Sequence, residues 1–288
     1  MHYKPSESLK LYGMDNFFNE ITKLYLDKKM PNKILLTGKK GLGKSTLAYH
    51  IINYALSIKE EFKYDINQFK INSNNKSFKL LQNNSHPNFY LVDLIDEKKT
   101  IDVAQIRKLI SYTNKSSFNN MSRFILIDNI ENLNKSSSNA LLKLIEEPNN
   151  NLFFILINNS EKNILATLKS RCLTFKINLT FIESVNILNS LIKKNFFEIV
   201  NHDLINYYTT PGEMIDLINF AEEKKINLNE YSLFDLLNLF IVNGYYKKNK
   251  FAKNLLINFI QLFLLKKYRL STTKNLFLIF YHNFLDKI

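Results

Sequence analysis

Residues 38 to 45 carry the glycines, the lysine and the hydroxyl side chain that a phosphate chain requires, in the spacing G-x-x-x-x-G-K-[ST]. Glycines let successive backbone N–H groups turn toward a phosphate, and the N-terminus of a following helix adds to the attraction. In such a loop the lysine reaches the β- and γ-phosphates, and the serine hydroxyl is a ligand of Mg²⁺. The predicted nucleotide-binding residues of this segment are Gly38, Gly41, Gly43, Lys44, Ser45 and Thr46.

The flanking sequence distinguishes a phosphate site from a glycine-rich turn that contains Lys-Ser by chance. Ile34 to Thr37 form a short apolar run that ends at the first glycine. From Leu47 to Leu56 the apolar residues recur with a helical period, so strand, loop and helix follow in the required order. This order favours the phosphate site.

A second group of candidate residues begins with Asp128, which ends the buried apolar strand predicted for residues 124–128. A carboxylate there can steady Mg²⁺, usually through water, whereas taken alone it is an ordinary polar strand end. The next residue is Asn129, whose amide cannot take a proton from an attacking water at neutral pH. Glu131 is the weaker alternative base, since a displacement of about an ångström can cost about a hundredfold in rate. We therefore expect a site that holds nucleotide and hydrolyses it slowly.

The elements that must position these residues alternate between strands and helices as far as about Ile177. Continuous apolar runs predict strands at residues 34–37, 88–92, 124–128 and 152–157, and helical periods predict helices at residues 102–113 and at 136–147, where Pro148 supplies the stop. The run at 152–157 does not alternate polar and apolar residues, which is typical of a parallel sheet covered on both faces. The predicted class is α/β, a P-loop parallel sheet with helices on both faces.

Two other regions lack strand signals. Residues 64–85 are rich in Asn, Lys and Ser without a clear period, which predicts a loop or a poorly ordered insert. Beyond Asn178, helical patterns cover residues 181–194, 211–223, 233–242, 251–267 and 273–285. The predicted domains are a nucleotide-binding domain at residues 1–178, a small helical lid at 179–227 and a C-terminal helical domain at 228–288.

The composition restricts the class of protein. The chain of 288 residues has 39 basic and 26 acidic side chains, a formal net charge of +13. A nucleic-acid partner is compatible with this charge, but heavy use of Lys, Asn and Ile is also typical of A·T-rich coding sequence. The lysine-rich C-terminal helices also have two interpretations. Their lysines are compatible with a nucleic-acid surface, but their aromatic stripe also fits helix packing.

Cys172 is the only cysteine, which excludes an internal disulfide and a cysteine-rich zinc site. No secretory or membrane-spanning segment is predicted, which indicates a cytoplasmic protein.

Longer motifs make a resemblance specific. They lie at residues 36–49, 86–88 and 101–107, in the run Asn139-Ala140-Leu141-Leu142-Lys143-Leu144-Ile145-Glu146-Glu147-Pro148, and in Ser170-Arg171-Cys172. Across about residues 10–180 the chain resembles the bacterial clamp-loader family, and within it the delta-prime type of DNA polymerase III subunit. The Asn-Ala-Leu-Leu-Lys helix together with the Ser-Arg-Cys motif is more discriminating than the phosphate loop.

This resemblance implies an AAA+ module, a small helical lid and a helical collar through which subunits form an open ring. The implied ring uses ATP to open the sliding clamp and to load it on primed DNA during replication. The implied partners are the gamma/tau and delta subunits, the sliding clamp and, through the complex, primed DNA, with no membrane partner. The implied cofactor is ATP or ADP, with Mg²⁺ held through Ser45 and Asp128. Zinc is not expected, because the zinc-binding cysteines of some relatives are absent here.

The family also implies roles for individual residues. Arg171 would act on ATP held by an adjacent subunit, countering the charge that builds up on the γ-phosphate, although by itself it is equally a solvated surface charge. Asn158 would sense the γ-phosphate, or else it opens a turn. Glu213 stands where motor subunits carry a basic residue, and it agrees with Asn129 in predicting a stator whose own ATPase activity is weak or absent. The alternatives are an ATP-hydrolysing motor subunit of the gamma/tau type and a stand-alone P-loop ATPase that acts on nucleic acid.

Overall fold

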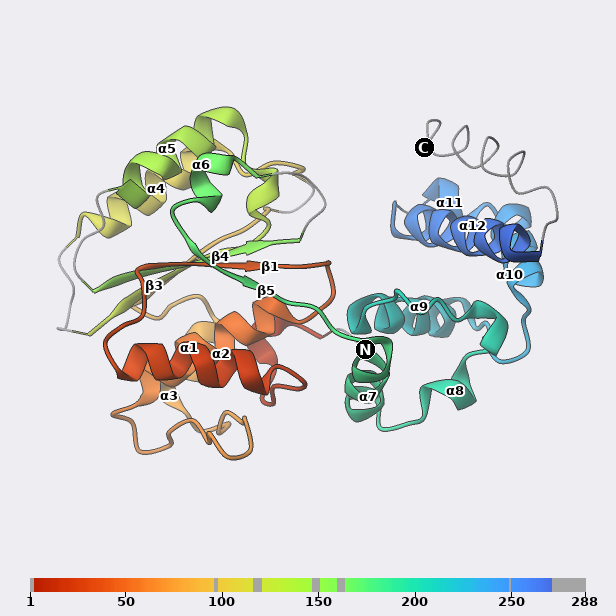
Figure 1. Ribbon diagram of the computed structural model, residues 1–288, viewed down its shortest axis with the longest axis horizontal. Helices are drawn as coiled ribbons and strands as arrows, with labels where there is room; N and C mark the ends of the chain where they lie inside the picture. Colours follow the sequence, from red (N-terminus) through yellow and green to blue (C-terminus); the bar gives the residue numbers. More distant parts are fainter. Residues whose placement is uncertain are drawn as a thin grey trace. The chain divides into compact units, whose positions relative to one another are not determined.

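A computed structural model describes residues 3–95, 98–115, 121–146, 151–159, 164–248 and 250–270 of the chain (Figure 1). Its internal contacts separate two compact units. The first consists of Met1–Ile187 with Thr210–Gly212, and the second of Leu188–Thr209 with Glu213–Ile288. The further division of the helical part near residue 227 stays a prediction.

The first unit is built on a five-stranded parallel sheet with the strand order β2-β3-β4-β1-β5 (Figure 1). The strands are β1 (Lys33–Thr37), β2 (Phe89–Val92), β3 (Arg123–Ile127), β4 (Leu152–Asn158) and β5 (Leu173–Lys176). They confirm the predicted strands and the predicted α/β class. Because the neighbours are parallel, the carboxyl ends of the strands meet at one edge of the sheet, which is where ligands bind in open α/β sheets.

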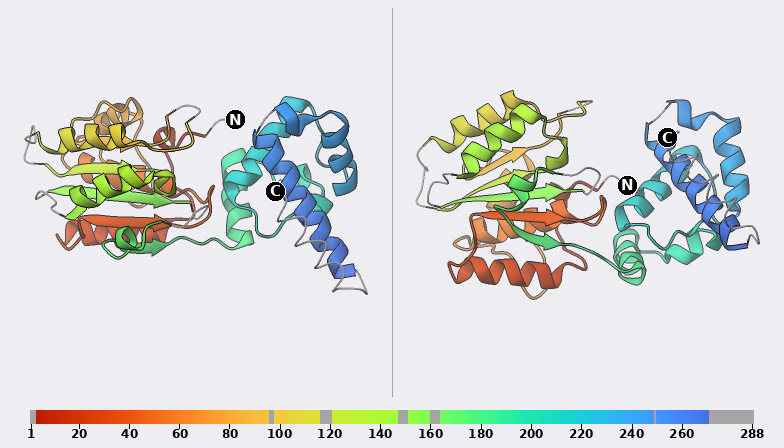
Figure 2. Two further views of the ribbon diagram at one scale, coloured as in Figure 1. Left: turned by 90° about the horizontal axis from the view of Figure 1, so that it is seen from above. Right: turned by 45° about the horizontal axis from the view of Figure 1, so that its top comes forward.

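Helices cover both faces of this sheet (Figures 1 and 2). They are α1 (Asp15–Leu26), α2 (Lys44–Ser57) and α3 (Lys76–Gln82) on one side, and α4 (Val103–Thr113), α5 (Lys135–Glu146) and α6 (Ala166–Lys169) on the other. In β1, Ile34 and Leu36 pack into the cluster with α1 and α2, whereas Leu35 packs into the cluster with α4 and α5. Successive side chains of a strand point to opposite faces, so a continuous apolar run fills both layers.

The prediction of a loop or poorly ordered insert at residues 64–85 is wrong for residues 76–82, which form a helix, whereas residues 64–75 form turns and connecting chain. Tyr64 is only 6% exposed in the core of the first unit, and the segment contains α3. The Asn75 side chain caps α3 by accepting from the Phe78 N–H at 2.7 Å, and the Glu60 carboxylate accepts from two further N–H groups of its first turn at 2.9 and 3.1 Å. A helix of seven residues is too short to show a period in the sequence, and its start is held by side chains outside it.

The helices predicted at residues 102–113 and 136–147 are confirmed as α4 and α5, while α1 lies outside every predicted helix. Helix α4 begins with a capping box, in which Asp102 Oδ1 accepts from the Gln105 N–H at 3.0 Å and Gln105 Oε1 accepts from the Asp102 N–H at 3.1 Å. At its other end the buried Arg123 guanidinium donates to three carbonyl groups at 2.9 to 3.3 Å. Both ends of α4 are therefore satisfied by side chains.

The described residues of the second unit form helices and connecting turns but no strands. The elements are the end of α7 (Phe181–Ile192), α8 (Phe196–Ile199), η3 (His202–Leu204), α9 (Pro211–Lys224), α10 (Leu233–Val242), α11 (Tyr245–Lys248) and α12 (Lys250–Leu270). They confirm four of the predicted helices, while the one at 273–285 and the stop at Pro148 lie outside the described residues. Helices α10, α11 and α12 contact one another. No helix in the described part of the chain is long and apolar enough to cross a membrane.

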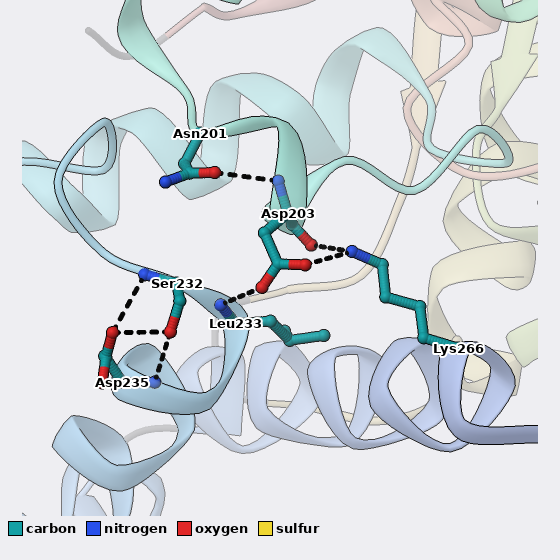
Figure 3. Close-up of polar contacts among 6 residues, drawn as sticks. All are labelled: Asn201, Asp203, Ser232, Leu233, Asp235 and Lys266. Atoms are coloured by element: carbon teal, nitrogen blue, oxygen red, sulfur yellow. Dashed lines mark hydrogen bonds and ion pairs between the residues drawn. The ribbon is translucent and has the colours of Figure 1, made fainter. Parts of the chain in front are cut away.

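Asp203 joins three elements of the second unit (Figure 3). Its carboxylate accepts from the Leu233 N–H at the start of α10 at 2.7 Å and pairs with Lys266 Nζ of α12 at 2.6 Å. The same Nζ also donates to the Asp203 carbonyl, and the Asn201 side chain accepts from the Asp203 N–H at 2.9 Å. Ser232 caps α10 beside this contact. The positions of η3, α10 and α12 are therefore linked at one carboxylate.

Candidate nucleotide site

The loop between β1 and α2 has the backbone that a phosphate site requires. Gly43 lies at φ 87° as the N-cap of α2, a left-handed conformation that residues with a Cβ rarely adopt. Lys44, Ser45 and Thr46 form the first turn of α2, so their N–H groups are among those that no helix carbonyl accepts. The start of this helix can therefore bind an anion with backbone donors and with the positive end of its dipole.

Lys44 is the buried cation of the loop, with only 3% of its surface exposed. Its Nζ donates to the carbonyl of Gly38 at 2.9 Å and to that of Lys39 at 2.5 Å. The carbonyl groups of the loop thus hold the ammonium group at the loop. Phosphate oxygens would be stronger partners, because a hydrogen bond between two charged groups is shorter and stronger than one to a neutral acceptor.

Asp128 directly follows β3 and contacts the loop through Ser45. Ser45 Oγ donates to Asp128 Oδ2 at 2.5 Å, and the Asn129 N–H donates to Asp128 Oδ1 at 2.8 Å. Burial raises the pKa of Asp128 to about 6 despite these bonds, and the nearby Asp93 carboxylate adds to the rise. A hydroxyl and a carboxylate are oxygen donors of the kind that Mg²⁺ selects, so this pair fits the ion. A bound divalent cation would favour the charged form of Asp128.

Asn129 bridges the ends of three neighbouring strands with its side-chain amide. Its Nδ2 donates to Asp93 Oδ1 at 2.7 Å, and its Oδ1 accepts from Asn159 Nδ2 at 2.8 Å. Asp93 directly follows β2 and Asn159 directly follows β4, while Asn129 lies beyond β3 at φ 56°. The amide is thus used as a bridge, and it offers no group that accepts a proton at neutral pH.

Glu131 is the other carboxylate near these strand ends, and only 7% of its surface is exposed. It belongs to η2 (Ile130–Asn132), and its Oε2 accepts from the Asn159 N–H at 3.2 Å. Its Oε1 is buried without a hydrogen-bond partner among the described residues. Burial and the bond to the backbone restrict the access of this carboxylate to an attacking water.

Residues Thr210–Gly212 belong to the first unit, and Gly212 contacts the phosphate loop there. The Gly212 N–H donates to the carbonyl of Gly41 at 2.9 Å. A Cβ built on Gly212 would lie 2.6 Å from the Gly41 Cα, so a larger residue would force the two segments apart. Glu213 is the next residue along the chain, and it belongs to the second unit.

Two predicted site residues remain. Asn158 lies at the phosphate loop, and Arg171 lies away from it, beside Glu146. Asn158 ends β4, and its carbonyl accepts from the Gly38 N–H at 3.3 Å, which places it at the phosphate loop. Arg171 follows α6, and its guanidinium contacts Glu146 and the carbonyl of Thr167 rather than the network around Asn129. The structure therefore brings all the predicted nucleotide-binding residues to one edge of the sheet and leaves Arg171 outside that group.

Comparisons with known proteins support these observations. A family model described as "DNA polymerase III, delta subunit" matches residues 13–180, a range that contains the phosphate loop, Asp128 and Arg171. The DNA polymerase III subunit delta' of Buchnera aphidicola subsp. Schizaphis graminum is 31% identical over 180 residues, which are 62% of this chain and 52% of that protein. This chain belongs to the delta-prime family of DNA polymerase III subunits. The parallel sheet, its two helix layers and the phosphate loop form the α/β module of this delta-prime chain.

Two further relatives extend the comparison. The gamma subunit of the same Buchnera strain is 28% identical over 246 residues, covering 82% of this chain and 64% of that protein. The delta' subunit of Escherichia coli K12 is 24% identical over 155 residues, covering 54% of this chain and 45% of that protein. The matches thus span about half the length of these curated delta-prime relatives.

Sequence reasoning missed Asp93 and Asn159 in this delta-prime chain. A signal for Asp93 was present, because it follows the strand predicted at 88–92 just as Asp128 follows its own strand. Carboxyl ends of parallel neighbours meet at one edge, so the polar residue after each strand is a candidate. The bridge through Asn129 had no such signal, because the partners of an amide depend on how three strands are aligned.

Proposed function

We propose that this chain is a delta-prime-type subunit of a bacterial DNA polymerase III clamp loader and helps the ATP-driven loading of the sliding clamp on primed DNA. The observation that carries the proposal is the family match over residues 13–180. The proposed partners are the gamma/tau and delta subunits, the sliding clamp and, through the assembled complex, primed DNA. The proposed location is the cytoplasm, where replication takes place in bacteria.

The chain's own site would bind ATP or ADP with Mg²⁺. Lys44 and the first turn of α2 would contact the phosphates, and Ser45 and Asp128 would hold the ion, usually through water. Hydrolysis would be slow, because Asn129 cannot take up the proton of an attacking water and Glu131 is buried. In this proposal the subunit is a stator that keeps a nucleotide site without an efficient hydrolytic centre.

Arg171 would serve the ATP of an adjacent motor subunit. Its side chain is 38% exposed, so a neighbouring protein can reach it. A guanidinium placed at the γ-phosphate in trans stabilises the charge that develops during phosphoryl transfer. The stator would thereby contribute to a reaction that it does not itself carry out.

Reconstitution of the loader from purified subunits tests this function. We expect the chain to co-purify with the gamma/tau and delta subunits, and DNA-stimulated ATP hydrolysis by the complex to require it. Arg171→Ala should leave assembly intact and lower this hydrolysis at least about tenfold, since trans-acting arginines contribute about 10³-fold or more. Lys169→Ala, which removes a nearby exposed cation, is the matched control. Failure to associate contradicts the proposed function, whereas association with unchanged hydrolysis in Arg171→Ala contradicts only the trans role.

A motor subunit is the second candidate function, because the gamma-subunit match covers 82% of this chain. A motor would hydrolyse ATP at its own site. Steady-state turnover by the purified chain that is abolished by Glu131→Ala would favour the motor over the stator. The Asn129 bridge leads us to expect no such turnover.

A further inference from the structure

The two most discriminating motifs of the sequence meet at one ion pair. Arg171 Nη2 lies 2.9 Å from Glu146 Oε1, although 25 residues separate the two along the chain. Arg171 Nη1 donates to the carbonyl of Thr167, also at 2.9 Å. Glu146 is the last residue of α5 and Thr167 belongs to α6, so two helices hold one guanidinium.

The stability of the fold gains little from this pair. The Arg171 side chain is 38% exposed and that of Glu146 is 49% exposed. Ion pairs in this environment are screened by water and salt, and many contribute nothing measurable to folding. A contribution to stability therefore does not account for the arrangement.

The geometry instead restricts the orientation of the guanidinium group. Arginine has five N–H donors, and the two contacts use one donor on each Nη atom. The guanidinium has these two contacts among the described residues, so three of its N–H donors remain for a ligand. A long arginine side chain otherwise samples many rotamers, and restricting them beforehand lowers the cost of binding. Donors that are in place before charge develops stabilise a transition state most effectively.

We infer that Glu146 is a positioning residue, which holds the Arg171 guanidinium so that its remaining N–H groups reach the γ-phosphate of ATP bound by an adjacent subunit. This inference rests on the proposed trans role of Arg171. The sign of the effect separates positioning from competition. Removal of a positioning carboxylate lowers hydrolysis, whereas removal of a carboxylate that competes with phosphate for the guanidinium raises it.

The test uses Glu146→Ala in the reconstituted loader. We expect kcat for DNA-stimulated ATP hydrolysis to fall about tenfold, because a small misplacement of a catalytic group costs one to two orders of magnitude. The KM for ATP and the affinity of subunit assembly should stay unchanged, since the contact acts in the transition state. Glu146→Gln keeps an acceptor oxygen without the charge, so its kcat should lie between those of Glu146→Ala and the unchanged chain.

Two controls separate positioning from a general loss of structure. Glu7→Ala removes another ion pair, the one between Glu7 and Lys4. The Glu7 side chain is also 49% exposed, and this variant should leave kcat unchanged. In the Arg171→Ala background, Glu146→Ala should have no further effect, because there is no guanidinium left to position. Thermal unfolding followed by circular dichroism should give the same midpoint for all these variants within about 2 °C.

Four outcomes would overturn the inference. An unchanged kcat in Glu146→Ala, while Arg171→Ala lowers it, removes the positioning role and leaves the trans role intact. A raised kcat shows competition in place of positioning. A further fall on adding Glu146→Ala to Arg171→Ala shows that Glu146 acts on something other than Arg171. If Arg171→Ala itself has no effect, the proposed trans role fails and the inference fails with it.

Discussion

The carboxyl edge of the sheet and the Asp203 contact of the second unit both gather polar side chains, yet their carboxylates are in opposite electrostatic situations. Asp128 is buried, and burial raises its pKa to about 6. Asp203 is partly exposed, and its bond with Lys266 lowers its pKa. A bound cation would stabilise the charged form of Asp128, whereas the charge of Asp203 is already paired with Lys266 within the fold. This contrast fits the proposed nucleotide site at the sheet edge and a structural contact at Asp203.

The two regions also differ in how fully their apolar residues are covered. Ile34 and Leu36 in the sheet have no exposed surface. In α10, by contrast, Phe234 is 58%, Ile241 56% and Val242 82% exposed. At spacings of seven and eight residues these three side chains share one side of the helix. Exposed apolar residues that gather on one face fit the proposed assembly with other subunits.

The largest expected effect removes the cation of the sheet-edge site. Lys44→Ala should weaken the binding of Mg²⁺-ATP about a hundredfold, because a charge-assisted contact to phosphate contributes about 3 kcal/mol. Equilibrium binding of a fluorescent ATP analogue measures this change. Lys40→Ala, at an exposed lysine of the same loop, should change the affinity only slightly. Equal affinities for the two variants would mean that Lys44 does not bind phosphate.

Acid should destabilise the first unit through His50. Burial lowers the pKa of His50 to about 4, with its Nε2–H donating to the Ser8 carbonyl and its Nδ1 accepting from Tyr64. The unfolded chain takes up the proton near pH 6.5, so stability present above that pH is lost as the pH falls toward 4. The loss should reach about 2 kcal/mol by pH 5. Urea unfolding followed by circular dichroism measures it, and His50→Gln should remove this pH dependence while the exposed His202→Gln should not.

The Asn129 bridge should stabilise the first unit by a smaller amount. Asn129→Ala leaves Asp93 and the buried Asn159 without their shared partner, which should cost about 1 to 2 kcal/mol of unfolding free energy. The same denaturation experiment measures the cost. Asn139→Ala, at an exposed position of α5, is the control. A cost no larger than that of the control would show that the bridge does not stabilise the strand ends.

The smallest expected effect concerns the contact in the second unit. Asp203→Asn keeps an acceptor for the Leu233 N–H but removes the charge that pairs with Lys266. Because the pair is partly exposed, the expected loss is only about 0.5 kcal/mol, and it should shrink further in high salt. Glu222→Gln on α9 is the control for loss of a surface charge. A loss of nucleotide affinity in Asp203→Asn would break the distinction between the structural contact and the binding site.

Much of the fold was accessible to prediction because its signals are local. The apolar runs of β1, β3 and β4 and the period of α5 are recognisable without knowledge of their partners. Helix α3 was not, because it is short and its first turn is held by the side chains of Asn75 and Glu60, which lie outside it. Irregular chain that packs through polar contacts leaves no period in the sequence.

The candidate site divides in the same way. The phosphate loop and Asp128 could be recognised from the residues alone, because a contiguous motif and a polar residue after an apolar strand need no distant partner. Four long-range contacts depended on the folded structure: Asn129 with Asp93, Asn129 with Asn159, Gly212 with Gly41, and Glu146 with Arg171. Sheet register and helix packing bring these residues together from distant parts of the chain, and no local pattern records which of them will meet.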